Sequence, residues 1–246
     1  MKREFQLKYQ SSILGSLWSI INPLAMIVVY TVIFSQLMKA RIPGIEGTYA
    51  YSIYLCSGII FWGMFAEVVE KLTNCFIDNA NLIKKISFPK VCIPASIVVG
   101  AGINFLIMLA LFILFLLITG NLPLLKLINI VPVFAVLVLF ASGLGVFLAV
   151  LNVFFRDVGQ FIRVLLQFWF WGTPIIYPIS ILPDALADIL VLNPMVTIIH
   201  AAQAIFVPSL SIDYARLGLV GLGSFLLLWV AVIFFRKHSD EIVDEI

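Results

Sequence analysis

Long uninterrupted runs of apolar residues dominate the chain. Stretches without any Asp, Glu, Lys or Arg cover 9–38, 47–66, 91–125, 127–155, 164–183, 189–212 and 217–235. A helix that crosses the hydrocarbon core of a bilayer needs about 20 mostly apolar residues, which these runs supply. Their apolar residues are continuous rather than alternating, which excludes the strands of a membrane barrel. The pattern therefore predicts an all-α membrane protein.

The composition supports the same class. Apolar residues make up 63% of the 246 residues, charged residues make up 11%, and the mean hydropathy is +1.14. A soluble domain carries about 25% charged residues, so lipid is the solvent that accepts this surface. The net charge of +2 is too small to indicate a nucleic-acid partner.

The runs predict a single transmembrane domain, 1–246, with six spanning helices. Glycine and proline residues interrupt the chain after the fifth helix, and we interpret 179–207 as one or two re-entrant or interfacial helices that line a gate or pathway. A seventh span over 185–207 is the alternative. Ala141, Gly145 and Ala149 recur every four residues and predict a face for close helix packing. The six predicted spans are 20–38, 51–69, 95–118, 130–152, 158–177 and 215–235.

The distribution of basic residues predicts the orientation. With six spans, Lys39, Arg41, Lys126 and Arg216 fall on one side and the other eleven of the 15 Lys and Arg residues fall on the opposite side. Basic residues concentrate on the cytoplasmic side of membrane proteins, so both termini are expected in the cytoplasm. A seventh span would move the basic residues of the C-terminus outside, so the charges favour six.

The first residues have amphipathic character. Phe5, Tyr9 and Ile13 are four residues apart and share one helical face, whereas Lys8 lies elsewhere. This pattern predicts a helix over 1–19 that lies in the membrane interface among the lipid headgroups. A disordered tail before the first span is the alternative.

A second amphipathic segment lies between two spans. Asp78 or Asn79 can cap a short helix over 79–88, and Pro89 limits its continuation. One face carries Leu82, Ile83 and Ile86, and Lys84 and Lys85 lie beside it. This apolar face requires a partner, which is either lipid or another protein.

Residues that carry catalytic chemistry are scarce. The sequence holds no GxxxxGK[ST] phosphate loop and no HExxH motif, so we assign no catalytic residue and no metal ligand. Glu67 and Glu70 are the acids nearest the interior of a span, and we place them at its cytoplasmic end. An enzyme or a self-powered carrier is therefore disfavoured. A passive channel or a permease powered by another subunit remains.

Several segments resemble one family, the ABC-2 type permeases. The opening segment 7–24, LKYQSSILGSLWSIINPL, is similar to the start of these permeases, although Gln10 replaces an arginine often found there. The FPK of 88–90 and the NVFFRDV of 152–158 resemble two of the family's cytosolic loops. The WFWGTPIIYP of 169–178 and the LNP of 192–194 resemble the branch that exports lipid-linked polysaccharides.

This resemblance implies a homodimer in the inner membrane with two copies of a separate ABC ATPase subunit. ATP and Mg would be used by that partner, and this chain would bind no cofactor. The implied substrate is an undecaprenyl-linked polysaccharide of the O-antigen type. Export of teichoic acid, a drug or a lipid is the alternative within the family. The segment 179–207 would form periplasmic gate helices and 79–88 a coupling helix, whose contact residues are Leu82, Ile83, Lys84, Lys85, Ile86, Phe88 and Pro89.

Aromatic residues form the candidate substrate channel. Aromatic rings stack on the apolar faces of sugars, and the polar atoms of Tyr and Trp bind hydroxyl groups. An ordinary interfacial belt or helix packing is the alternative. The channel candidates are Tyr30, Phe34, Phe168, Trp169, Trp171 and Tyr177.

Overall fold

The computed structural model describes residues 49–85, 89–179 and 189–245, with single positions at 21, 25, 28, 29, 32 and 183. Every regular element in these ranges is a helix. The predicted interfacial helix lies outside the described residues, as does the first span apart from these single positions. The same holds for the site candidates Phe5, Lys8, Tyr9, Ile13, Tyr30, Phe34, Ile86 and Phe88, and for the side chain of Lys85.

Four helices of the described ranges are long and apolar enough to cross a bilayer. They are α3 (Ala50–Asp78), α5 (Cys92–Ile118), α10 (Tyr214–Lys237) and the segment Leu124–Phe154. This last segment joins the short 3-10 helix η3 (Leu124–Asn129) to α6 (Ile130–Phe154). The prediction of an all-α protein with several apolar helices is confirmed for this part of the chain.

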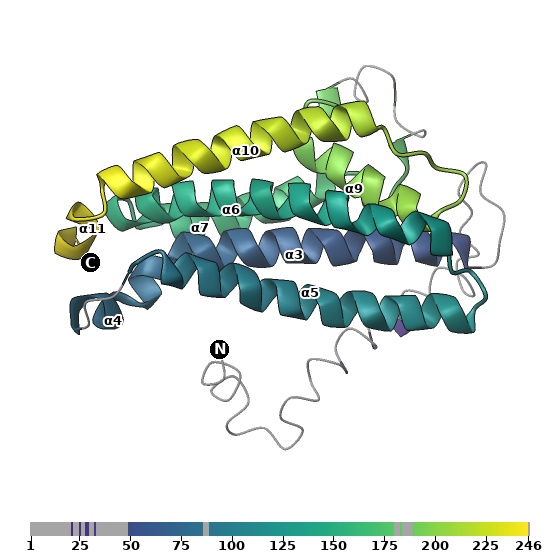
Figure 1. Cartoon of the computed structure of the whole chain (residues 1–246), viewed down its shortest axis with the longest axis horizontal. Helices are drawn as coiled ribbons and strands as arrows, with labels where there is room; N and C mark the ends of the chain where they lie inside the picture. Colours follow the sequence, from purple (N-terminus) through teal and green to yellow (C-terminus); the bar gives the residue numbers. More distant parts are fainter. Residues whose placement is uncertain are drawn as a thin grey trace.

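Four shorter α-helices complete the described part of the chain. They are α4 (Ala80–Lys85), α7 (Asp157–Trp171), α9 (Pro194–Phe206) and α11 (Glu241–Glu245). In Figure 1, α4, α11 and the C-terminus gather at one end of the long helices, and α9 lies toward the opposite end.

Helix α6 is the centre of the packing, with α3 on one side and α10 on another (Figure 1). A Cβ atom on Gly145 would lie 2.7 Å from Cβ of Leu72 in α3, and one on Gly143 would lie 2.8 Å from the backbone nitrogen of Leu228 in α10. Close approach of helix backbones is how membrane helices gain van der Waals contact. The predicted small-residue face on α6 is confirmed as such a contact.

The helix after Arg156 is shorter than the predicted span, which runs to 177. Helix α7 ends at Trp171, and the chain leaves the helical conformation at Gly172. Pro174 has no backbone N–H to donate, and it disfavours a helical conformation at the residue before it. The helix therefore stops before this proline, and residues 172–179 follow an irregular path.

Candidate functional site

The irregular segment 172–179 packs inside the molecule rather than on its surface. Its residues 173–175 are buried. An irregular backbone inside a membrane protein requires protein or water to satisfy the carbonyl oxygens that helices normally satisfy themselves. Here all six carbonyl oxygens from 172 to 177 accept a hydrogen bond from the protein. The segment is therefore held by the fold without a need for water.

Side chains of α3 and α9 supply most of these hydrogen bonds. The hydroxyl of Tyr54 lies 3.2 Å from the carbonyl of Pro174 and 3.1 Å from that of Tyr177, and it can donate to either. Tyr51 donates to the carbonyl just before Tyr177 at 2.6 Å. From α9, the amide nitrogen of Gln203 reaches the carbonyl of Pro174 and that of the next residue, each at 3.4 Å.

Asn193 joins the end of α7 to the start of α9. Its Oδ1 caps α9 by accepting from the backbone nitrogen of Met195 at 3.0 Å, and it also accepts from Nε1 of Trp169 at 3.0 Å. Its Nδ2 lies 3.5 Å from the carbonyl of Gly172 and 3.3 Å from Oγ1 of Thr173. The oxygen of this side-chain amide thus accepts hydrogen bonds, and its nitrogen donates them.

The four described channel aromatics do not form one surface. The ring of Trp169 is partly buried and packs against the core, with its centroid 5.3 Å from that of Phe65. Phe168 and Trp171 are exposed on α7, and the Tyr177 hydroxyl donates to the carbonyl of Trp171 at 2.7 Å. Among the described candidates, only Phe168 and Trp171 therefore present large exposed rings, and their channel role stays a prediction.

The predicted coupling segment contains a divided apolar face. Helix α4 covers 80–85, within the predicted range 79–88. Ile83 packs into the core, whereas Leu82 is 46% exposed and Lys84 is exposed. Pro89 is exposed beyond the helix. Of the predicted contact residues, Leu82, Lys84 and Pro89 are thus the described ones that a docked protein could contact, and Ile83 holds the helix in place.

The C-terminal tail lies beside this segment, which the sequence did not predict. The Lys90 ammonium donates to the backbone oxygen and to Oγ of Ser239, and it is 3.9 Å from the carboxylate of Asp240. Ile242 of α11 is fully buried. The only signal in the sequence is the opposite charge of Lys90 and the acidic tail.

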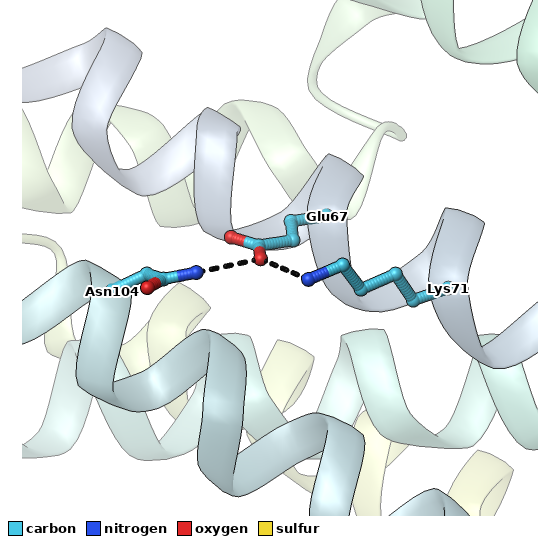
Figure 2. A network of polar contacts seen from close by, with 3 residues as sticks. All are labelled: Glu67, Lys71 and Asn104. Atoms are coloured by element: carbon cyan, nitrogen blue, oxygen red, sulfur yellow. Dashed lines mark hydrogen bonds and ion pairs between the residues drawn. The ribbon is translucent and has the colours of Figure 1, made fainter. Parts of the chain in front are cut away.

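A polar network on α3 and α5 is shown in Figure 2. Oε1 of Glu67 accepts from Nζ of Lys71, one turn later on α3, at 2.5 Å and from Nδ2 of Asn104 on α5 at 2.8 Å. The side chains of Glu67 and Lys71 remain 25% and 49% exposed. Both contacts converge on one carboxylate oxygen, and the other oxygen points away from them (Figure 2).

This network lies deeper than the sequence suggested. Asn104 is 12 residues after the first residue of α5 and 14 before the last, which is roughly 18 Å and 21 Å along the helix axis. A hydrocarbon core of about 30 Å centred on α5 therefore has Asn104 near its middle. We expected Glu67 at the cytoplasmic end of its span, with the helix continuing beyond the membrane surface. Helix α3 does continue to Asp78, but Glu67 contacts the middle of α5.

A lysine closes the other end of the short helix α9. Nζ of Lys126, on η3, lies 3.1–3.4 Å from the carbonyl oxygens of Ala204, Val207, Pro208 and Leu210. These oxygens belong to the end of α9 and the loop after it, where a helix carries partial negative charge. The lysine thus fastens η3 to α9 by contacts that its sequence position alone did not reveal.

The family model of ABC-2 type transporters matches residues 1–207. The match covers most of the chain, so this protein belongs to the ABC-2 type transporter family. With its apolar helices, this makes the chain a multi-pass membrane component of a transporter.

Curated relatives are similar in sequence to this chain over nearly their whole length. The chain is 31% identical to the O-antigen export system permease protein RfbA of Klebsiella pneumoniae, over 96% of this chain and 88% of the relative. It is also 31% identical to RfbA of Myxococcus xanthus, over 100% and 93%. The polysialic acid transport protein KpsM of Escherichia coli is 20% identical, over 98% and 92%.

Proposed function

We propose that this chain is the membrane subunit of an ATP-driven exporter that moves undecaprenyl-linked polysaccharide of the O-antigen type across the inner membrane. The observation that carries the proposal is the nearly full-length similarity, at 31% identity, to permeases of O-antigen export systems. Similarity to a polysialic acid transport protein is lower, at 20%, which favours the O-antigen type of substrate.

The energy source belongs to another subunit in this proposal. The sequence contains no phosphate loop to hold a nucleotide. Two copies of an ABC ATPase would bind ATP and Mg and act on a homodimer of this chain, which itself performs no chemical reaction. Helix α4 would transmit the motion, because it is short and presents Leu82 and Lys84 outward.

The proposed subunit has six spans with both termini in the cytoplasm. Four are the long helices described above, the first lies at 20–38, and α7 with the irregular segment after it supplies the fifth. Helix α9 would then be part of the periplasmic gate. The shared position of α4, α11 and the C-terminus at one end of the helices supports this orientation (Figure 1). Basic residues in these loops support it too.

Reconstitution with the ATPase encoded in the same genome tests the proposal. Proteoliposomes that hold both proteins should take up lipid-linked polysaccharide only when ATP is supplied on the ATPase side. Solute flux without nucleotide would instead identify a passive channel. ATP-dependent movement of teichoic acid or a drug, with no movement of polysaccharide, would keep the permease and replace the substrate.

The docking role of α4 has its own matched test. Leu82→Asp places a charge on the exposed apolar side chain, and Asn81→Asp places the same charge on the neighbouring exposed residue. We expect Leu82→Asp to reduce co-purification of the ATPase and ATP-driven export, with a smaller effect of Asn81→Asp. Equal effects of the two variants would argue against a specific apolar contact.

A further inference from the structure

We propose that Glu67, Lys71 and Asn104 form a binding site for the hydroxyl groups of sugars, on a face of α3 that borders the transport pathway. The inference rests on the proposed export of polysaccharide and names where the sugar chain touches the protein. Its residues are on α3 and α5, whereas the exposed aromatic side chains are on α7.

Several hydrogen-bond donors and acceptors of this network have no partner among the described residues. Within the described ranges, Oε2 of Glu67 and Oδ1 of Asn104 have no hydrogen-bond partner. The ammonium of Lys71 has three N–H groups, and its described contact is with Glu67. Two acceptors and further donors are thus available within one cluster. A sugar hydroxyl, which both donates and accepts, is the ligand group that fits this combination.

The depth of the network argues against contact with lipid. Charged side chains inside a bilayer almost always face a bundle interior or a water-filled cavity, since exposure to hydrocarbon costs several kcal/mol. Yet Lys71 is about half exposed, and Glu70 beside it is exposed as well. Asn104 is near the middle of α5. This face of α3 must therefore meet water or a polar ligand at membrane depth.

The charges of the network favour a neutral ligand group. A carboxylate repels phosphate and other anions, and an ammonium repels metal cations. Glu67 and Lys71 form an ion pair, so the site carries both charges and favours neither an anion nor a cation. Glycan hydroxyls carry no charge and meet both members of the pair equally well.

The surface next to the network has room for a ligand and for a cysteine side chain that reports on it. Gly63 is one turn before Glu67 on the same helix face, and a Cβ atom there would have no other atom within 4 Å. Gly223 on α10 is a matched control, because a Cβ atom there is equally free. Of the native cysteines, Cys56 and Cys75 are buried and Cys92 is exposed, so Cys92→Ser provides the background.

The experiment measures how fast a charged methanethiosulfonate reagent modifies Gly63→Cys and Gly223→Cys. Both variants are reconstituted with the ATPase partner. We expect the cysteine at 63 to react several-fold faster than the one at 223. Lipid-linked polysaccharide extracted from the native cells, added with a non-hydrolysable ATP analogue, should slow the reaction at 63 alone. Undecaprenyl phosphate, which carries no sugar chain, should give no protection.

Three results would overturn the inference. Equally slow reactions at 63 and 223 would mean that this face of α3 lies against lipid. A fast reaction at 63 without protection by polysaccharide would mean water but no sugar. Protection by undecaprenyl phosphate would mean lipid contact. Glu70→Cys repeats the test if Gly63→Cys does not fold. Export by the unsubstituted protein is measured in parallel, and its absence would refute the proposed function rather than this site.

Discussion

Polar groups occur in two contrasting settings among the described helices. Around Asn193, the side chains are partly buried and the carbonyl oxygens of 172–177 all accept hydrogen bonds. Around Glu67, one carboxylate oxygen receives both contacts, and Lys71 stays about half exposed. In the first setting the protein satisfies the hydrogen-bonding groups itself. In the second, donors and acceptors remain available to a ligand.

This difference separates stability from function. Enclosed polar groups hold irregular backbone in place, and removal of one partner leaves others buried and unsatisfied, at about 1–3 kcal/mol each. An exposed ion pair contributes only about 0–1 kcal/mol, so stability does not explain charges on an exposed helix face at membrane depth. We therefore expect substitutions at the two places to act on different properties.

The largest loss of stability is expected for Asn193→Leu. This variant leaves the Trp169 indole, the Met195 amide and the Gly172 carbonyl without their partner, at a total of about 3–5 kcal/mol. Thermal unfolding followed by size-exclusion chromatography should show a much lower midpoint. Asn121→Leu is the matched control, because Asn121 is exposed and bonds only to a neighbouring carbonyl. Equal midpoints of the two variants would contradict our description of the first setting.

Lys126→Met is expected to have the next largest effect. It removes the cation from four carbonyl oxygens at the end of α9, at about 2 kcal/mol. Lys126→Arg keeps the charge and should recover part of the lost midpoint. No change in Lys126→Met would show that η3 and α9 are held together by other contacts.

Tyr54→Phe should cost less, about 1 kcal/mol, because Gln203 still bonds the carbonyl of Pro174 and only the partly buried carbonyl of Tyr177 loses its partner. Tyr49→Phe is the control, since the Tyr49 hydroxyl bonds to none of the described residues and its ring packs against the core beside Phe115. A larger midpoint shift in the control would mean that the ring environment, rather than the hydroxyl, determines the effect.

Acid should also act on the enclosed region, through His200 on α9. Burial lowers the pKa of His200 from its usual 6.5, and Arg216 adds to this effect while Asp213 opposes it. The neutral form is therefore favoured in the folded protein. Its contribution to stability is complete above the unfolded pKa of about 6.5 and is lost as the pH falls below that value. His200→Gln should make the midpoint less dependent on pH between 8 and 5, and an unchanged dependence would exclude this residue.

The smallest change in stability is expected for Glu67→Gln, which preserves shape and removes the charge. The free energy of unfolding should change by no more than about 0.5 kcal/mol, as for an exposed ion pair, so the thermal midpoint should hardly move. Export of polysaccharide should nevertheless fall roughly tenfold, because a charged acceptor for hydroxyl groups is lost. Normal export together with a strongly lowered midpoint would mean that Glu67 serves stability rather than transport.

The sequence predicted the long helices because each needs only a sustained apolar run. It also predicted the close contact of α6, because small residues at a spacing of four define one face. The depth of Glu67 was not predictable in the same way. Charges after 66 suggested that the span was ending and that the helix continued past the membrane surface. Helix α3 does continue to Asp78, but the contact of Glu67 with Asn104 depends on how two helices are aligned.

The enclosed contacts required the tertiary structure. The Asn-Pro pair at 193 is a recognisable helix start, yet its contact with Trp169 forms only because α7 ends beside α9. The contact of Lys90 with Ser239 joins residues 149 positions apart, and no local pattern records it. Within the predicted coupling face, Leu82 is exposed and Ile83 is buried. Helical spacing alone does not distinguish these two residues.

A structure of the protein bound to its ATPase partner and to lipid-linked polysaccharide tests the contrast most directly. We predict sugar density within hydrogen-bond distance of Glu67, Lys71 and Asn104, while the contacts of Asn193 with Trp169 and Met195 remain as they are here. Sugar density that follows only the exposed aromatic rings of α7, with lipid covering Glu67 and Lys71, would contradict the account.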